Sequence, residues 1–339
     1  MPGYRKRHQY SANQEKMRDF FYIDRVFDDF EAFADNARLW NVQMTQLSTG
    51  KAINTLKQLS LGKAKLNYLL FNGHKTTVGD PPPGHTFAIY SSGVDSKLVW
   101  RKKKVMKNDL MIFPLGAEHD VMTKGENIHV FTVTLPEAVW SKSLSEKESE
   151  MYDKQISSQE TMNLSDGEMI RLRLSLSKIF QIIEKAPQVL NQDSFRKRIE
   201  EQTFHAITRA LFSAQHNNSL QPARNTMKRA WDKIELVIKK NGNSLLPINE
   251  LSQAVGVSER SLRRLFHDRY CLSPKNYLKR IRLNEVRSEL KKLSEHETKV
   301  ADVANRWGFW HMGQFAADYK LLFGELPSST LRKNRLLEG

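Results

Sequence analysis

Four basic side chains in the C-terminal third of the chain repeat at the spacing of one helix face. The positions i, i+3, i+4 and i+7 are taken by Arg260, Arg263, Arg264 and His267. Guanidinium groups in that array can bind guanine O6 and N7 in a major groove, or they can anchor to phosphate oxygens. A solvated charged surface would show the same stripe, so its neighbours along the chain must decide between the two.

The other side of this predicted helix is apolar, and its start is capped. Leu262, Leu265 and Phe266 face a core, and Ser258 is well placed as the N-cap. The helix before it ends at Gly256, whose freedom at positive φ permits a tight turn. A helix, a tight turn and a basic second helix form a helix-turn-helix, which favours DNA binding over a solvated face.

The same pattern occurs a second time at a fixed offset, which is typical of a duplicated unit. The apolar and turn residues that recur 52 positions later are Ile248, Leu251, Val255 and Gly256, matched by Val300, Val303, Trp307 and Gly308. After the turn the offset becomes 53, and Phe266 and Pro274 recur as Tyr319 and Pro327. The sequence therefore predicts two helix-turn-helix units.

The second unit is less basic than the first. Its predicted core face consists of Phe315, Tyr319, Leu322 and Phe323. Its predicted outer face consists of His311, Gln314, Ala317 and Asp318. We therefore expect this unit to contribute less base contact than the first.

A long helix is expected to join the two units. Ser273-Pro274 is a good helix start, and the apolar residues that follow it are Tyr277, Ile281, Val286, Leu290 and Leu293. Successive major-groove faces of B-DNA lie about 34 Å apart. A rigid helix can hold two recognition helices at that distance.

The net charge of the chain agrees with a polyanionic partner. The 339 residues carry a formal net charge of +15, with a pI near 9.7. Residues 225–339 hold 22 Lys and Arg against 13 Asp and Glu, so +9 of that charge lies in the C-terminal third. Double-stranded DNA is the partner that this distribution favours.

Residues 228–335 resemble the DNA-binding domain of the AraC/XylS family of bacterial transcription regulators. The matching motifs are Leu251-Ser-Gln-Ala-Val-Gly-Val-Ser258 with Leu262-Arg-Arg-Leu-Phe266, Ser273-Pro-Lys-Asn-Tyr277 with Arg282-Leu283, and Val303-Ala304 with Gly308-Phe309. Within the family, Trp307-Gly-Phe-Trp-His-Met-Gly-Gln-Phe315 is most similar to the ethanolamine-utilisation regulators. The resemblance implies a regulator, favouring an activator, that recruits RNA polymerase to promoter DNA.

The resemblance also assigns DNA-contacting positions to both units. In the first they are Ser258, Arg260, Ser261, Arg263, Arg264 and His267, and in the second His311, Met312, Gly313 and Gln314. Two residues depart from the family pattern: Ala317 replaces a common basic residue, and Cys271 replaces a common Gly. We expect Arg264→Ala to abolish operator binding, and alanine at Gln314 to weaken it less.

The N-terminal part of the chain predicts an antiparallel β-barrel. From Asn41 to Leu135, apolar residues alternate in short runs separated by Gly, Asn, Pro and Asp, and a short helix around Phe27, Phe30, Phe33 and Ala34 precedes them. Asn108, Pro114, Gly116 and His119 resemble the second cupin motif, but the His-x-His pair of a metal-binding first motif is missing. We therefore expect a cupin-like barrel without a metal or other cofactor.

An effector pocket in such a barrel would lie in its mouth or interior. The candidate lining residues are Phe87, Tyr90, Trp100, Phe113 and His119. For His119 the sequence favours a hydrogen-bonded structural histidine over a ligand contact. The sequence does not identify an effector.

The fold class predicted is therefore α+β with two domains. Residues 1–140 form the cupin-like domain, 141–215 a helical segment that either pairs two subunits or packs on the barrel, 216–224 a polar linker, and 225–339 the DNA-binding domain. On the helical segment, one apolar face consists of Leu172, Leu176, Ile179 and Ile183, and Phe195, Ile199, Phe204 and Ile207 follow beyond Pro187.

The remaining features favour a cytoplasmic regulator. Cys271 is the only cysteine, and the chain shows neither a signal peptide nor a membrane-spanning run. We expect a homodimer that binds promoter DNA and RNA polymerase, senses a small molecule and is not an enzyme. Two alternatives stay open: a barrel enzyme with an attached DNA-binding domain, and a regulator whose barrel mediates only protein interaction.

Overall fold

The alternating apolar residues of the N-terminal half form two antiparallel sheets. The computed structural model describes residues 20–91, 97–113, 119–153, 157, 159–214, 225–241, 246–293 and 298–333. The larger sheet has the order β1 (Phe20–Phe27), β3 (Asn54–Leu61), β4 (Lys65–Phe71), β11 (Ile128–Leu135), β6 (His85–Ser91), β9 (Asp109–Phe113) and β12 (Thr161–Asn163). The smaller has the order β2 (Asn41–Gln46), β5 (Lys75–Asp80), β10 (His119–Lys124), β7 (Lys97–Trp100) and β8 (Lys103–Lys104).

The two sheets enclose one apolar core. Leu56 and Phe71 of the larger sheet pack there with Trp100 of the smaller one. Helix α1 (Phe30–Asn36) closes one side, and it starts at Asp29, whose carboxylate caps the backbone N–H of Glu31. The short helix predicted before the barrel is confirmed, although Phe27 lies in β1 instead.

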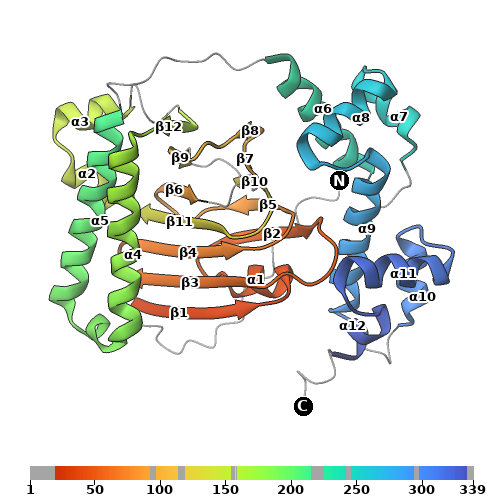
Figure 1. Cartoon of the computed structure of the whole chain (residues 1–339), viewed down its shortest axis with the longest axis horizontal. Helices are drawn as coiled ribbons and strands as arrows, with labels where there is room; N and C mark the ends of the chain where they lie inside the picture. Colours follow the sequence, from red (N-terminus) through yellow and green to blue (C-terminus); the bar gives the residue numbers. More distant parts are fainter. Residues whose placement is uncertain are drawn as a thin grey trace.

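The outer face of the larger sheet is covered by helices. Helices α4 (Asp166–Lys185) and α5 (Asp193–Ala214) lie against it, at the left of Figure 1. The connecting elements are α2 (Glu137–Ser143), α3 (Glu146–Met151) and the 3-10 helix η2 (Pro187–Asn191).

The apolar stripe predicted for the helical segment is buried. Leu172, Leu176, Ile179 and Ile183 are at most 5% exposed and belong to one core with the sheet. The stripe therefore packs on the chain's own barrel. Strand β12 interrupts the segment predicted as helical, because it pairs with β9 at the sheet edge.

The C-terminal part of the chain is helical. It consists of α6 (Asn225–Asn241), α7 (Ile248–Val255), α8 (Glu259–Tyr270), α9 (Pro274–Leu290), α10 (Val300–Arg306), α11 (Met312–Phe323) and α12 (Pro327–Lys333). These helices lie on the side of the smaller sheet, away from α4 and α5 (Figure 1). The predicted linker 216–224 falls outside the described residues. No described helix has the length and apolar character needed to cross a bilayer.

Candidate functional site

Helices α7 and α8 form the first predicted helix-turn-helix. Helix α7 ends at Gly256, whose φ of +78° makes the tight turn. Helix α8 begins after Ser258, and the Ser258 hydroxyl accepts a hydrogen bond from the backbone N–H of Ser261 at 3.1 Å. Leu262 and Phe266 are fully buried. The capping and core predictions for this unit are confirmed.

The basic face of α8 points to solvent. Arg260, Arg263, Arg264 and His267 are all exposed, as are Ser258 and Ser261. The side chain of Arg264 is 84% exposed, and its nearest carboxylate, on Asp268, is 3.7 Å away. Arg263 donates to Glu259 one turn earlier, at 2.8 Å. Both arginines lie on the surface of a capped helix, where such ion pairs contribute little and DNA phosphates can replace them.

Helices α10 and α11 form the second unit with a different surface. Gly308 makes the turn with a φ of +75°, and His311 precedes α11. His311, Gly313 and Gln314 are exposed and Met312 is half-buried. Asp318, predicted on the outer face, instead lies toward α9, because its carboxylate accepts a hydrogen bond from Lys279 at 2.9 Å. That interaction removes the acidic side chain from the surface that would meet DNA.

Trp310 is an exposed aromatic residue that sequence reasoning did not single out as a contact. It precedes α11, and 67% of it is accessible. Helical periodicity could not indicate Trp310 as a contact, because it lies in the turn rather than on a helix face.

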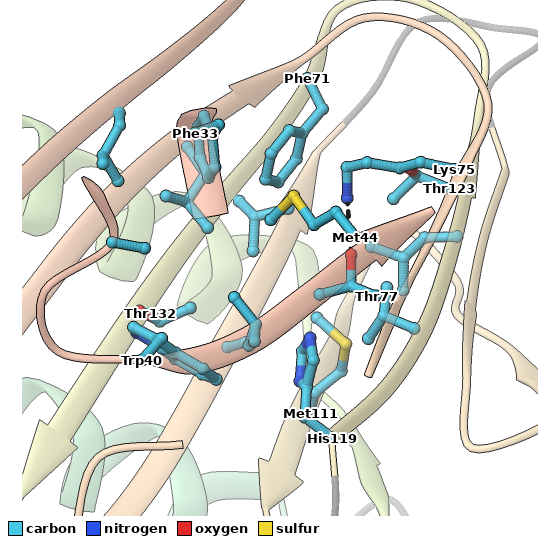
Figure 2. A pocket seen from close by; sticks show the side chains of 18 of the residues that line it. Phe33, Trp40, Met44, Phe71, Lys75, Thr77, Met111, His119, Thr123 and Thr132 are labelled. Carbon is cyan, nitrogen blue, oxygen red and sulfur yellow. Dashed lines mark hydrogen bonds between the residues drawn. The ribbon is translucent and has the colours of Figure 1, made fainter. Parts of the chain in front are cut away.

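The barrel holds a cavity between its two sheets. Its empty volume is about 630 Å³ with the adjoining open solvent included, and apolar side chains make up most of its wall. Figure 2 shows Phe33, Phe71 and Met44 around it, with Lys75 and Thr77 on one side and His119 below them. A concave, mostly apolar space with a few polar groups is the usual form of a small-molecule site.

Only part of the predicted effector set lines this cavity. Phe113 and His119 do, with their rings stacked at 5.4 Å between centroids. Trp100 packs behind them, 4.3 Å from Phe113, and Tyr90 is buried in the same core without lining the cavity.

Phe87 lies on the other face of the sheet, so its assignment to the pocket was wrong. Its neighbour Ala88 lines the cavity, and alternate residues of a strand point to opposite faces. Phe87 therefore faces the helices, where its ring lies 5.4 Å from that of Trp140.

Beside His119, the cavity is lined by polar residues that were not predicted, among them Lys75 and Thr77 on β5 and Thr123 on β10. Lys75 is 1% exposed, and its Nζ donates to the Thr77 hydroxyl at 3.0 Å. Burial lowers the pKa of Lys75 to about 7. Burial, followed by the charge of Lys75, lowers the pKa of His119 to about 3, so its imidazole is neutral.

Lys75 and Thr77 escaped prediction because, on β5, these polar side chains point inward and the apolar one points outward. Val78 is exposed, whereas Lys75 and Thr77 are buried. An apolar-inward assignment of the strand would place all three on the wrong face.

Strand β10 connects the cavity with the DNA-binding unit. His119 and Thr123 line the cavity, whereas Asp120 and Met122 lie on the opposite side of the strand. The carboxylate of Asp120 accepts two hydrogen bonds from Arg269 of α8, at 3.1 and 3.2 Å. Met122 is 2% exposed and belongs to the core of the first unit. One strand therefore has the cavity on one face and the recognition helix on the other.

A second set of contacts joins the barrel to α9. The Asp29 carboxylate pairs with Arg287 at 2.9 Å and with Lys291. Burial acts in the other direction, yet these two cations hold the pKa of Asp29 well below its ordinary value. The amide of Asn284 donates to the Gln46 carbonyl and accepts from the Gln46 N–H, both at 2.9 Å. The joining helix is thus fixed to the barrel by polar bonds.

The described residues contain no group of three His, Cys, Asp or Glu side chains that could hold a metal ion. Pro114 and Gly116 of the cupin-like motif fall outside the described residues. The contacts of His119 are aromatic, with Trp40, Trp100 and Phe113.

A family model matches the C-terminal helices. Residues 251–333 match the family model described as "Helix-turn-helix domain". The XylDLEGF operon transcriptional activator 1 of Pseudomonas putida is 26% identical over 215 residues, which are 62% of this chain and 63% of that protein. Activator 2 of the same operon and organism is 30% identical over 106 residues, which are 31% of this chain and 68% of that protein.

The matched region spans less than two thirds of activator 1, and 32% of another XylDLEGF operon transcriptional activator from Pseudomonas putida. Among solved structures, that of the AraC-like transcriptional activator CuxR aligns with a TM-score of 0.40 and 15% identity. The alignment covers 78% of this chain and 94% of CuxR.

Proposed function

We propose that this chain, which belongs to the AraC/XylS family of transcription regulators, binds double-stranded promoter DNA in a sequence-specific manner. The observation that carries the proposal is the exposed basic face of α8, presented by the second helix of a capped helix-turn-helix. Arg260, Arg263, Arg264 and His267 supply the phosphate and base contacts, with Ser258 and Ser261 at the helix start.

The second unit adds a weaker contact to the neighbouring major groove. Its contribution comes from the start of α11, through His311, Met312, Gly313 and Gln314. Because these residues include no Lys or Arg, they add less to affinity than the arginines of α8.

The barrel acts as a small-molecule sensor in this proposal. The cavity supports a sensor over a barrel that mediates only protein interaction, and the regulator names of the relatives do not favour a barrel enzyme. A ligand shifts the protein only if it binds one arrangement of barrel and DNA-binding domain more tightly than another. Strand β10 offers the physical link, because a change at His119 or Thr123 moves the backbone that positions Asp120 against Arg269.

The active species in this proposal is a homodimer in a reducing cytoplasm that recruits RNA polymerase as an activator. Ile170 and Leu174 on α4 are 53% and 65% exposed, one turn apart, and so offer an apolar patch for pairing. Activation is supported by the names of the XylDLEGF relatives. Light scattering of wild type and of the Ile170→Glu/Leu174→Glu variant tests the pairing, and an unchanged mass rejects this surface.

The deciding experiment is a selection of genomic fragments by the purified full chain, followed by footprinting at one fixed salt concentration. Wild type and Arg198→Ala, which removes an exposed cation on α5, should protect two adjacent major grooves. Arg264→Ala should lose that footprint. Salt-sensitive binding without sequence preference in the wild type would reject the proposal.

A further inference from the structure

The barrel cavity contains a buried lysine without a carboxylate partner. Lys75 Nζ lies 3.7 Å from the centroid of the Phe71 ring, and its hydrogen bond goes to the neutral hydroxyl of Thr77. No carboxylate of the described residues forms an ion pair with it. A buried ammonium group without an anion is costly for the fold, so such a group is retained where it serves a site.

Other polar groups of the cavity wall also lack partners. The buried atoms Trp40 Nε1, Gln58 Nε2 and Thr123 Oγ1 make no hydrogen bond, although their residues line the cavity. The indole and amide nitrogens can only donate, and the hydroxyl can donate as well. His119 Nδ1 is a further buried atom without a partner. The wall therefore offers a surplus of donors.

This set of groups restricts the chemical class of the ligand. Among the described residues that line the cavity there is no Asp or Glu to compensate a cationic ligand. A sugar-like polyol needs acceptors as well as donors, and a phosphate would leave most of its charge against apolar side chains. An acceptor-rich anionic head on an apolar body matches the lysine, the free donors and the surrounding Met44, Leu69 and Phe113.

We infer that the cavity binds a small monocarboxylate, whose carboxylate pairs with Lys75 Nζ and whose apolar body fills the space between the sheets. This inference rests on the proposed function only in taking the cavity as the effector site. Thr123 and Trp40 complete the hydrogen bonds of the carboxylate, and Thr77 holds the Lys75 side chain in position.

The test is thermal unfolding of the full chain with a panel of acids and their uncharged amides. The acids are the straight-chain series from butanoate to decanoate, with phenylacetate and cyclohexanecarboxylate. Three proteins are compared: wild type, Lys75→Met, and Lys97→Met, which makes the same change at an exposed position of the same sheet. At a ligand concentration about a hundredfold above Kd, we expect the melting temperature of wild type and Lys97→Met to rise by about 5 °C.

Lys75→Met should lose that response. Without ligand, Lys75→Met should melt above the wild type, because the change removes an unpaired buried charge while keeping the volume of the side chain. If Lys75 only stabilised the fold, the variant would melt below the wild type, and that result would overturn the inference. Equal stabilisation by acids and amides, or by none of the panel, would overturn it too.

Failure of this inference can be separated from failure of the proposed function. The footprint of the ligand-free protein tests DNA binding alone, whereas the melting shifts test the cavity alone. If the carboxylic acids raise the melting temperature of a protein that gives no footprint, the regulator proposal is rejected and the carboxylate site is kept. A footprint without any change in melting temperature would keep the regulator proposal and reject the carboxylate site.

Discussion

The two helix-turn-helix units have the same helix order but differ in what completes their cores. The core of the first unit includes Leu47 and Met122 of the barrel, together with Trp231 and Phe266. The core of the second unit is built within the C-terminal helices, around Tyr319 and its neighbours. The unit with the basic recognition face is thus the one whose packing depends on the barrel.

This difference assigns separate tasks to the two units. A ligand in the barrel can act on the first unit through shared apolar packing and the Asp120–Arg269 ion pair. The second unit meets the barrel through polar bonds, such as that from Gln46 to the Leu322 carbonyl at 2.7 Å. We therefore expect regulation and most of the DNA affinity to converge on α8, with α11 as an auxiliary contact.

The largest expected effect is on DNA affinity. Arg264→Ala should lower operator affinity about a hundredfold, because a bidentate guanine contact contributes about 1–3 kcal/mol and the phosphate charge is lost as well. Gln314→Ala in the second unit should lower operator affinity by less than about tenfold. Fluorescence anisotropy at constant salt measures both. The reverse order would invalidate the ranking of the two units.

The next largest effect should be on local stability, and it distinguishes the core that the first unit shares with the barrel from the separate core of the second unit. Met122→Ala, a change in the barrel, should remove about 2–5 kcal/mol of packing and speed hydrogen exchange in α7 and α8. Phe315→Ala should speed exchange in α10, α11 and α12 instead. If Met122→Ala leaves α8 protected, the first unit does not depend on the barrel.

Local features of both units could be predicted from the sequence, whereas the relation between the units and the barrel could not. The Ser258 cap, the Gly256 turn and the spacing of the α8 arginines are set within a few residues, so periodicity and capping rules reveal them. Asp120 and Arg269 are 149 positions apart, and nothing local indicates that they pair.

The candidate cavity was predicted only in part for a related reason. Phe113 and His119 follow the expected inward pattern, but Lys75 contradicts it, since a lysine on an alternating strand is normally placed outside. The residue that does most to define the proposed ligand class is therefore the one that a hydrophobic pattern assigns to solvent.

A smaller effect is expected from the ion pair between strand β10 and α8. Asp120→Asn should weaken docking of the first unit by about 1–3 kcal/mol, because buried Arg269 then keeps only the Glu235 carboxylate, at 3.5 Å, as an ion-pair partner. Asp318→Asn is the matched control, since its pair with Lys279 lies within the DNA-binding domain. Exchange at the end of α8 should rise in the first variant alone. Equal rises in both would mean that the Asp120 contact has no special role in docking.

The smallest expected effect concerns how the two recognition helices end. Helix α8 ends at Cys271 with a φ of +51°, whereas α11 ends at Gly324 with a φ of +72°. A residue with a Cβ is strained in this left-handed region, so Cys271→Gly should stabilise the first unit by less than about 1 kcal/mol, after the added freedom of the unfolded chain is subtracted.

Gly324→Ala should have the opposite sign in the second unit, because it introduces the same strain and brings its Cβ to 3.2 Å from Lys51 Cγ. Denaturant melts followed by hydrogen exchange in α8 and α11 measure the two changes, and Cys271→Ala separates loss of the thiol from relief of the backbone. A stabilisation by Cys271→Ala equal to that of Cys271→Gly would show that the side chain, rather than the backbone, sets the difference between the helix ends.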